Sequence, residues 1–387
     1  MINKQILRFK SRRSYKVIYS EHITSKIIKN YSFKNTLFYN SKLIISNENS
    51  ILIKKCKKSG SWVKVKLMKR NLLFWTSRNL KLIKGNNLSL FNARNFGVNV
   101  ISSATITKLC NITVKSTPIE SSLNIYDHEI IEKGNIDFDE AFYMCVNGSD
   151  QFQHFIQDFL PILAFVGPFL RENSKMPLIL KKSIKNVMHY EFYFNLLEIK
   201  NPRLYIYEND IGIKNLYILN FLPINALYCL PQDLYASLYN VVTRNKTYQI
   251  SPKKNLVLFT RKEISRNFAN EEFLVEELKL RCSYLGLNLI VLNPGSTDLI
   301  SIITALSNAK YVIGMHGGAL YNMLFAAQDS TLIEFITTNS SDSLAHMIRS
   351  FGLNYMPYAI DADKGTNEIH ITKADLDFIF FNISRHT

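Results

Sequence analysis

The chain has 387 residues, a length that allows two domains of ordinary size. Hydrophobic residues make up 47% of it and aromatic residues 12%, which excludes a largely disordered chain and indicates a packed globular protein. The formal charge of +16 suggests a nucleic-acid or membrane partner, but the Lys and Arg residues are scattered through a chain that is also rich in Asn and Ile. We therefore expect a weakly basic surface that allows peripheral contact with an anionic membrane, and no nucleic-acid partner.

The cysteines and the N-terminus indicate a reducing compartment. The five cysteines lie far apart, and no two have the spacing of metal ligands, so free thiols are expected. The basic N-terminus lacks the apolar core of a signal peptide, and no run reaches the roughly 18 apolar residues of a membrane-spanning helix. The sequence predicts a cytoplasmic protein, with peripheral contact at the inner face of the membrane left open.

Residues 1–135 consist of short apolar segments separated by polar turns, a pattern typical of β-structure. Strands are expected at 42–45, 51–53, 62–67, 72–75 and 98–101. We find no catalytic or metal-binding motif in this part. We interpret it as the β-rich portion of the N-terminal domain or as an extension of that domain.

A histidine and an aspartate stand out after residue 136. A strand is expected at 141–146, followed by a turn and a helix over 151–166. His154 and Asp158 are four residues apart, so they share one face of that helix. An imidazole beside a carboxylate is how proteins hold a general base in one tautomer. The same spacing fits an ordinary surface pair worth about 0.3–0.5 kcal/mol, and periodicity alone does not separate the two interpretations.

The region up to residue 250 continues with alternating strands and helices, which gives a second domain over 136–250. These elements are expected at 177–181, 183–197, 203–207, 216–219 and 231–248. The polar segment 246–254, which contains Pro252, is the predicted linker to a third unit over 251–387.

The last third has the clearest periodicity. Apolar strands alternate with helices of 10–15 residues, which predicts an α/β fold with a doubly wound parallel sheet. Strands are expected at 255–259, 287–292, 311–313, 331–336 and 355–360. Helices are expected to begin at Asn270, which we predict to be a cap, and at 298, 342 and 373. Such a sheet binds its ligand at the carboxyl ends of its strands.

Polar residues follow these strands. Arg261 comes directly after the strand 255–259, and His316-Gly317-Gly318 follows the strand at 311–313 and precedes a helical pattern. Helix amides and arginines favour an anion such as a phosphate. Glu334 lies in the next strand, and we expect it near the strand's end, where it would accept hydrogen bonds from ligand hydroxyls. The plain alternative for the glycine pair is a tight turn in an α/β sheet.

Several chemistries are weighed against this site. A metal-dependent transferase would use an Asp-x-Asp pair, and three such patterns occur, at 137–139, 361–363 and 375–377. An esterase would need Gly-x-Ser-x-Gly and a dehydrogenase Gly-x-Gly-x-x-Gly, and both motifs are absent. A basic nucleic-acid-binding protein would need neither the His-Gly-Gly turn nor the His154/Asp158 pair. A metal-independent transfer with a diphosphate leaving group fits best.

Roughly residues 140–340 resemble glycosyltransferase family 61, a group of bacterial polysaccharide and eukaryotic sugar transferases. The family usually reads His-Gly-Ala-Gly where this chain has His-Gly-Gly-Ala. The matching pieces, in chain order, are 152–155 with Asp158, Thr260-Arg261, Arg266, Asn270-Glu271, 309–325 and 332–334. The resemblance implies a GT-B arrangement, with two Rossmann-like domains facing a cleft, inversion at the anomeric carbon, and neither an essential metal nor a cofactor.

From these observations we predict an inverting glycosyltransferase that moves a sugar from a nucleotide sugar, with a UDP-sugar favoured, to a glycan or lipid-linked acceptor in surface-polysaccharide or lipopolysaccharide assembly. His154 supported by Asp158, or the reverse, would be the base, and Glu334 would bind the ribose. The other predicted substrate-binding residues, mainly for the diphosphate, are Arg261, Arg266, Asn270, His316, Gly317, Gly318, Ala319 and Asn322. The alternatives are a metal-dependent Asp-x-Asp transferase and a non-enzymatic nucleic-acid-binding protein.

Overall fold

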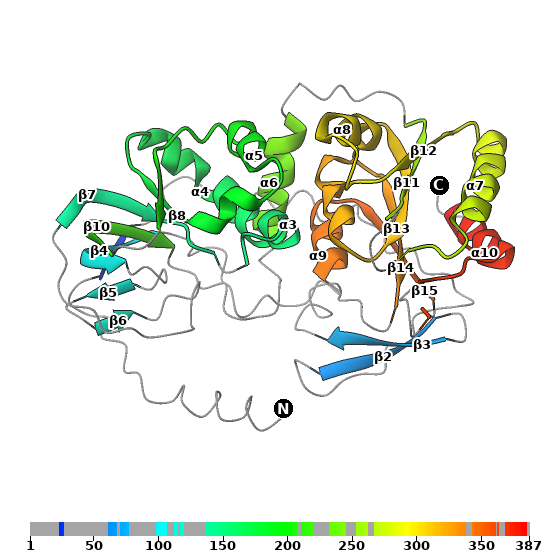
Figure 1. Ribbon diagram of the computed structural model, residues 1–387, viewed down its shortest axis with the longest axis horizontal. Coiled ribbons are helices and arrows are strands. Elements are labelled where there is room, and N and C mark those ends of the chain that lie inside the picture. Colours follow the sequence, from blue (N-terminus) through cyan, green and yellow to red (C-terminus); the bar gives the residue numbers. More distant parts are fainter. Residues whose placement is uncertain are drawn as a thin grey trace.

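The protein consists of two α/β halves that lie side by side (Figure 1). The computed structural model describes residues 23–26, 61–67, 70–76, 98–106, 112–114, 117–119, 136–146, 148–206, 210–219, 232–244, 253–261, 267–337, 343–360, 362–363 and 368–384. Every structural statement below refers to these residues.

The N-terminal half is built on a mixed sheet. Its strands follow the order β6-β5-β4-β10-β7-β8-β9, with β1 also pairing with β4. The β10-β7-β8-β9 part is parallel, whereas β4 pairs antiparallel with β10 and β5. The strands are β1 (Ile23–Lys26), β4 (Val98–Ile106), β5 (Ile112–Val114), β6 (Thr117–Ile119), β7 (Ile136–Tyr143), β8 (Leu178–Lys181), β9 (Arg203–Ile206) and β10 (Ile211–Leu219).

The expected β-content before residue 136 is confirmed where it can be compared. The strands expected at 62–67, 72–75 and 98–101 correspond to β2 (Ser61–Leu67), β3 (Arg70–Thr76) and β4, and β2 pairs antiparallel with β3. Those expected at 42–45 and 51–53 lie outside the described residues, as does most of the expected linker at 246–254. Because β1, β4, β5 and β6 share a sheet with β7 to β10, the N-terminal sheet extends across residue 135.

The helix that carries His154 contains a π-helical turn. It begins as α3 (Phe152–His154), widens into η3 (Phe155–Phe159) and continues as α4 (Leu160–Glu172). In the widened turn the N–H of Leu160 donates to the carbonyl of Phe155, five residues back. Pro161 follows at once and has no N–H to continue an ordinary ladder. Such π-turns occur frequently at functional sites.

The single helix expected over 183–197 was wrong. The structure has a 3₁₀ helix, η4 (Lys182–Asn186), and a separate helix, α5 (Tyr190–Leu196). His189 between them adopts a left-handed conformation with φ of 60°, which interrupts the helical backbone. The hydrophobic pattern continues across the break because Ile184 and Val187 are buried alongside Phe194.

The C-terminal half confirms the predicted parallel sheet. Its strand order is β12-β11-β13-β14-β15, and all four pairings are parallel. The chain leaves β11 in one direction to form β12, then returns to the other side of β11 for β13, which makes β11 and β13 the topological switch point. The strands are β11 (Asn255–Phe259), β12 (Asn288–Leu292), β13 (Ala309–Met315), β14 (Thr331–Ile336) and β15 (Asn354–Ala359).

Helices cover both faces of this sheet, as Figure 1 shows. Leu256 and Leu258 of β11 pack in the cluster on the α7 and α10 side, whereas Val257 and Phe259 pack on the α8, α9 and η5 side. Because both faces of this strand are covered, residues 256–259 are all apolar. The covering helices are α7 (Glu271–Leu285), α8 (Leu299–Ser307), η5 (Gly318–Phe325), α9 (Ser343–Ser350) and α10 (Lys373–Ser384).

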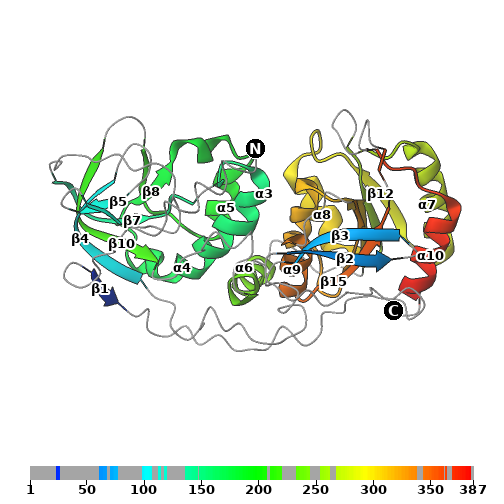
Figure 2. The ribbon, with the colours of Figure 1, turned by 90° about the horizontal axis from the view of Figure 1, so that it is seen from below.

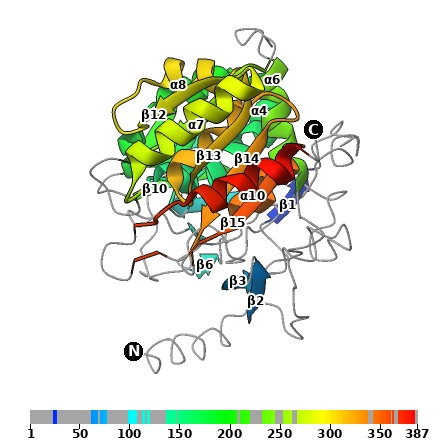
Figure 3. The same ribbon diagram turned by 90° about the vertical axis from the view of Figure 1, so that its right-hand side faces the viewer.

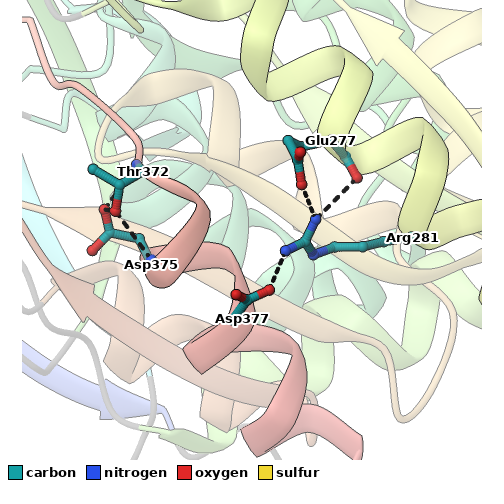
Figure 4. A network of polar contacts seen from close by, with 5 residues as sticks. All are labelled: Glu277, Arg281, Thr372, Asp375 and Asp377. Carbon is teal, nitrogen blue, oxygen red and sulfur yellow. Dashed lines mark hydrogen bonds and ion pairs between the residues drawn. The ribbon is translucent and has the colours of Figure 1, made fainter.

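The outer helices α7 and α10 lie side by side (Figure 3) and are joined by polar contacts (Figure 4). Arg281 of α7 pairs with Glu277 on its own helix and with Asp377 of α10. At the start of α10, the carboxylate of Asp375 accepts hydrogen bonds from the backbone N–H and hydroxyl of Thr372. These contacts fix the outer layer, on the face of the sheet away from the N-terminal half.

The two halves share one hydrophobic core. Helix α6 (Gln232–Arg244) lies between them (Figure 2) and contacts α4 on one side and α9 and η5 on the other. The Tyr239 hydroxyl donates to the carbonyl of Ala326 at 2.8 Å, and its ring stacks on Phe351. No helix in the described part of the chain is long and apolar enough to span a membrane.

Candidate functional site

Arg261 and the turn after β13 meet at the switch point. Arg261 follows β11, and His316 and Gly317 follow β13, so they extend from the carboxyl ends of adjacent parallel strands. A methyl group added to Gly317 would lie 2.7 Å from Nη1 of Arg261. Any larger residue here would displace the guanidinium, and this contact rather than the backbone favours glycine, because Gly317 itself has a nearly extended backbone.

His316 is anchored by a buried carboxylate. Its Nδ1 lies 2.5 Å from Oε1 of Glu334, and the Tyr355 hydroxyl donates to Oε2 of Glu334 at 2.6 Å. Glu334 is fully buried, in the middle of β14, where it faces its partners on β15 and after β13. We expected Glu334 near the end of the strand as an acceptor for ligand hydroxyls; it lies two residues before the end of β14, and both of its oxygens already accept or share hydrogen bonds within the protein.

Removing this carboxylate should destabilise the fold. Glu334→Leu would leave the buried Tyr355 hydroxyl and Nδ1 of His316 without their acceptor, and each should lower the free energy of unfolding by about 1–3 kcal/mol. Glu334→Gln keeps the shape and the oxygen acceptor and should retain most of the stability. Urea unfolding of the two variants measures the difference, and equal stabilities would contradict this role for Glu334.

The segment after Gly317 forms a 3₁₀ helix rather than the α-helix that its pattern suggests. The side-chain amide of Asn322 donates to the carbonyl of Ala319 at 3.0 Å, so this hydrogen bond lies within its own helix. Asn322 is buried, while Gly318 and Ala319 are half-buried at the first turn. The amides of Gly317, Gly318 and Ala319, at the start of this helix, are the backbone groups predicted to contact an anion.

The predicted pair in the N-terminal half is formed. Nδ1 of His154 lies 2.7 Å from Oδ2 of Asp158, and each side chain is 16% exposed. Burial raises the pKa of Asp158 above its ordinary value, while the hydrogen bond and charge of His154 act in the opposite direction. With Nδ1 held by Asp158, Nε2 is the nitrogen of His154 that can exchange a proton with a ligand.

The loop before the helix shapes the position of His154. Gly148 adopts a left-handed conformation with φ of 74°, and an added methyl group there would lie 3.2 Å from Cγ and Cδ2 of the imidazole. The turn thus requires glycine for its backbone and leaves room for the ring beside it.

A hydrogen-bonded link connects the two segments. The side chain of Gln153 donates to the Tyr321 hydroxyl at 3.0 Å, and this hydroxyl donates to Gln157 at 2.9 Å. Gln153 and Gln157 immediately precede His154 and Asp158, and Tyr321 belongs to η5 after Gly317. Sequence reasoning missed these roles, as it did for Tyr355. The one available signal was the spacing of four residues between the two glutamines.

One predicted ligand-binding residue, Asn270, makes its side-chain hydrogen bonds outside this arrangement. Asn270 occupies the N-cap position of α7, as predicted, but its side chain makes no capping hydrogen bond. Its side-chain amide donates to the carbonyl of Ile371 and accepts a hydrogen bond from the backbone N–H of Ile371. This is the pattern that a paired β-strand would provide. Arg266 lies outside the described residues.

In two of the three Asp-x-Asp patterns, the aspartates have partners within the fold. Asp375 also accepts a hydrogen bond from Tyr358, and Asp377 pairs with Arg281, so this pair serves the packing of α10. Asp137 accepts the backbone N–H of Gly212 in the N-terminal sheet. Asp361 lies outside the described residues. Within the part of the chain that the structure describes, no group of three or more His, Cys, Asp or Glu residues is arranged to hold a metal ion.

Comparison with known proteins gives one family match, over parts of both halves. A family model described as Glycosyltransferase 61 matches residues 152–333, a range that contains His154, Asp158, Arg261 and His316 and ends one residue before Glu334. No curated protein matches the chain. Through this stretch, which is slightly less than half of the chain, the protein matches glycosyltransferase family 61, and this match supports its assignment as a glycosyltransferase.

Proposed function

We propose that this protein is an inverting glycosyltransferase of the GT-B type that needs no essential metal ion. The nucleotide-sugar donor would bind to the C-terminal half, beside Arg261 and the turn at 316–318, and the acceptor to the N-terminal half, beside His154. The observation that carries the proposal is the close packing of Arg261 against Gly317. It brings a guanidinium and backbone amides together at the carboxyl ends of two adjacent parallel strands.

In the proposed reaction, Nε2 of His154 accepts the proton of the acceptor hydroxyl. The acceptor oxygen forms a bond to the anomeric carbon as the bond from that carbon to the donor phosphate breaks. This single displacement inverts the configuration of the carbon. The electron pair of the broken bond passes to the phosphate oxygen, where Arg261, His316 and the amides of Gly318 and Ala319 stabilise the charge.

Glu334 acts differently in this proposal from the ribose contact that its position in the sequence suggests. Its bond to Nδ1 of His316 leaves Nε2 as the nitrogen that faces the phosphate. We therefore assign Glu334 to the orientation of His316 and leave the ribose contact to other groups. Asn270 has no role in the proposed donor site, because Ile371 engages both ends of its amide.

The proposal includes the setting of the reaction. The donor is a UDP-sugar, and the acceptor is a glycan or a lipid-linked glycan in the assembly of a surface polysaccharide or lipopolysaccharide. The reaction takes place in the cytoplasm, and the net charge of +16 supports peripheral contact with an anionic membrane. The family match argues against the non-enzymatic nucleic-acid-binding alternative.

Nucleotide binding tests the donor part of the proposal. UDP, GDP and CMP are added separately to the protein, and its thermal unfolding is followed. A nucleotide at about 100 times its dissociation constant should add about 2.7 kcal/mol of stability, and we expect this from UDP. If none of the three raises the unfolding temperature, the proposed donor site is wrong.

Metal dependence is tested on turnover of UDP-sugars. Activity should persist in EDTA, since Arg261, His316 and backbone amides carry the charge stabilisation in this proposal. Loss of activity in EDTA that Mn²⁺ restores would favour the Asp-x-Asp mechanism instead.

A further inference from the structure

The link through Tyr321 is a buried polar contact in an interface made largely of aromatic rings, where the hydrogen bond from Tyr239 to Ala326 is a second polar contact. The side chains of Tyr321 and Gln157 are both fully buried. Around them the halves meet through rings, such as Tyr193 stacked on Phe325 and Tyr239 stacked on Phe351. A buried amide and hydroxyl destabilise a protein unless they are hydrogen-bonded, and apolar side chains would fill the same space without that risk. The hydrogen bonds of this link therefore orient the two segments relative to each other, whereas apolar side chains would only fill the space between them.

The link has a specific place relative to the proposed site. Gln153 and Gln157 lie on the segment that carries His154 and Asp158, and the π-helical turn begins between them. Tyr321 lies one turn after Gly317, in the helix whose first amides face the proposed phosphate. Two hydrogen bonds to one hydroxyl fix both the separation of the two segments and the rotation of the π-turn about its axis.

We propose that Tyr321 is a positioning residue for sugar transfer. Its hydroxyl, held between Gln153 and Gln157, sets the proposed base, His154, in line with the donor phosphate. This inference rests on the proposed function, since it concerns the alignment of the same two groups. It goes beyond it by assigning the alignment to a single hydroxyl that would contact neither substrate.

The physical reason is the geometry of an inverting displacement. The acceptor oxygen and the departing phosphate must lie on opposite sides of the anomeric carbon, and a misplacement of about 1 Å lowers the rate about 100-fold. The phosphate contacts of Arg261 and His316 lie within the C-terminal half, so loss of the link should not change them. The effect should therefore appear in kcat and not in nucleotide affinity.

Tyr321→Phe tests this directly, because it removes the hydroxyl and keeps the ring. We expect kcat for UDP-sugar turnover to fall about 10- to 100-fold, with the affinity for UDP changed by less than about twofold. Amide hydrogen exchange should increase in residues 152–159. A kcat within about twofold of that of the unmodified protein, or unchanged exchange in 152–159, would overturn the proposal.

Tyr239→Phe is the matched control. It also removes a buried hydroxyl that bonds across the two halves, but its partner is the Ala326 carbonyl and not the segment with His154. We expect a similar loss of thermal stability, with kcat and exchange in 152–159 unchanged. If both variants lowered kcat equally, Tyr321 would be one of several structural contacts.

A double variant separates alignment from stability. Tyr321→Phe with Gln157→Leu replaces both fully buried members of the link by apolar groups, which should restore most of the lost stability. Activity should stay low, because no hydrogen bond sets the π-turn. Recovery of kcat together with stability would show that Tyr321 only supports the fold.

Two variants distinguish a failure of the positioning role of Tyr321 from a failure of the proposed function. If His154→Ala transfers sugar normally, the base assignment is wrong whatever Tyr321→Phe does. If His154→Ala is inactive and Tyr321→Phe is fully active, the base stands and the positioning role fails. Hydrogen exchange requires no substrate, so it tests the link even for a protein that does not turn over UDP-sugars.

Discussion

Replacing His154 with alanine should lower the rate of sugar transfer about 100- to 10,000-fold while leaving the affinity for UDP unchanged, since general-base catalysis typically contributes a factor of this size. The imidazole lies in the N-terminal half, and Asp158 rather than a phosphate-binding residue holds it. Initial rates at saturating UDP-sugar and thermal shift with UDP measure the two quantities separately. His370→Ala, which removes an exposed histidine in the C-terminal half, is the control. Normal transfer by His154→Ala would exclude it as the base.

Asp158→Asn should also lower transfer, by a different route. An asparagine amide can donate to Nδ1 of His154, and the ring would then carry its proton on Nε2, where it cannot accept one from an acceptor hydroxyl. The two variants together test whether the pair acts as one unit.

The pH dependence of kcat follows from the buried carboxylate. Because the pKa of Asp158 is raised, it takes up a proton at a higher pH than an exposed aspartate would. Protonated Asp158 no longer offers the negative charge that stabilises the imidazolium formed at His154 during transfer. Activity should therefore be present above this raised pKa and be lost as the pH falls through it. Asp158→Asn should lack that part of the acidic limb.

Gly317→Ala should weaken UDP binding about 10- to 100-fold. The added methyl group would lie 2.7 Å from Nη1 and 3.1 Å from Cζ of Arg261, so the guanidinium must move away from the turn. A charge-assisted bidentate contact to phosphate depends on the placement of both nitrogens, and its loss corresponds to about 1.5–3 kcal/mol. Isothermal titration with UDP gives the change in affinity directly.

Gly295→Ala is the control for Gly317→Ala. It adds the same methyl group in the turn after β12, where the nearest atom is Oδ1 of Asn293 at an ordinary 3.4 Å. We expect its UDP affinity to match that of the unmodified protein. An unchanged affinity for Gly317→Ala would mean that Arg261 has no role in donor binding.

Local sequence patterns were sufficient for several parts of this structure. The alternation of apolar strands and amphipathic helices after residue 254 predicted the parallel sheet. The spacing of four residues predicted the contact between His154 and Asp158, because neighbours one helical turn apart meet with little help from the rest of the chain. The π-turn did not disturb this pair.

Long-range contacts determined the roles of individual polar residues. Glu334 was expected to contact a ligand, and Asn270 to cap a helix, from their places in the sequence. Their observed partners include Tyr355 for the first and Ile371 for the second, 21 and 101 residues along the chain. Periodicity indicates whether a residue lies on a buried face, but it does not indicate which side chain from another element meets it there.

The sequence by itself determined the parallel sheet, the His154–Asp158 contact and the positions of Arg261 and His316 directly after their strands. Only the tertiary structure decided that these two strands are neighbours at the switch point, that Gly317 admits the Arg261 guanidinium, and that Tyr321 joins the two halves. The physical reason is range: backbone periodicity and helical spacing act over a few residues, whereas strand order and side-chain partners depend on how the whole chain packs.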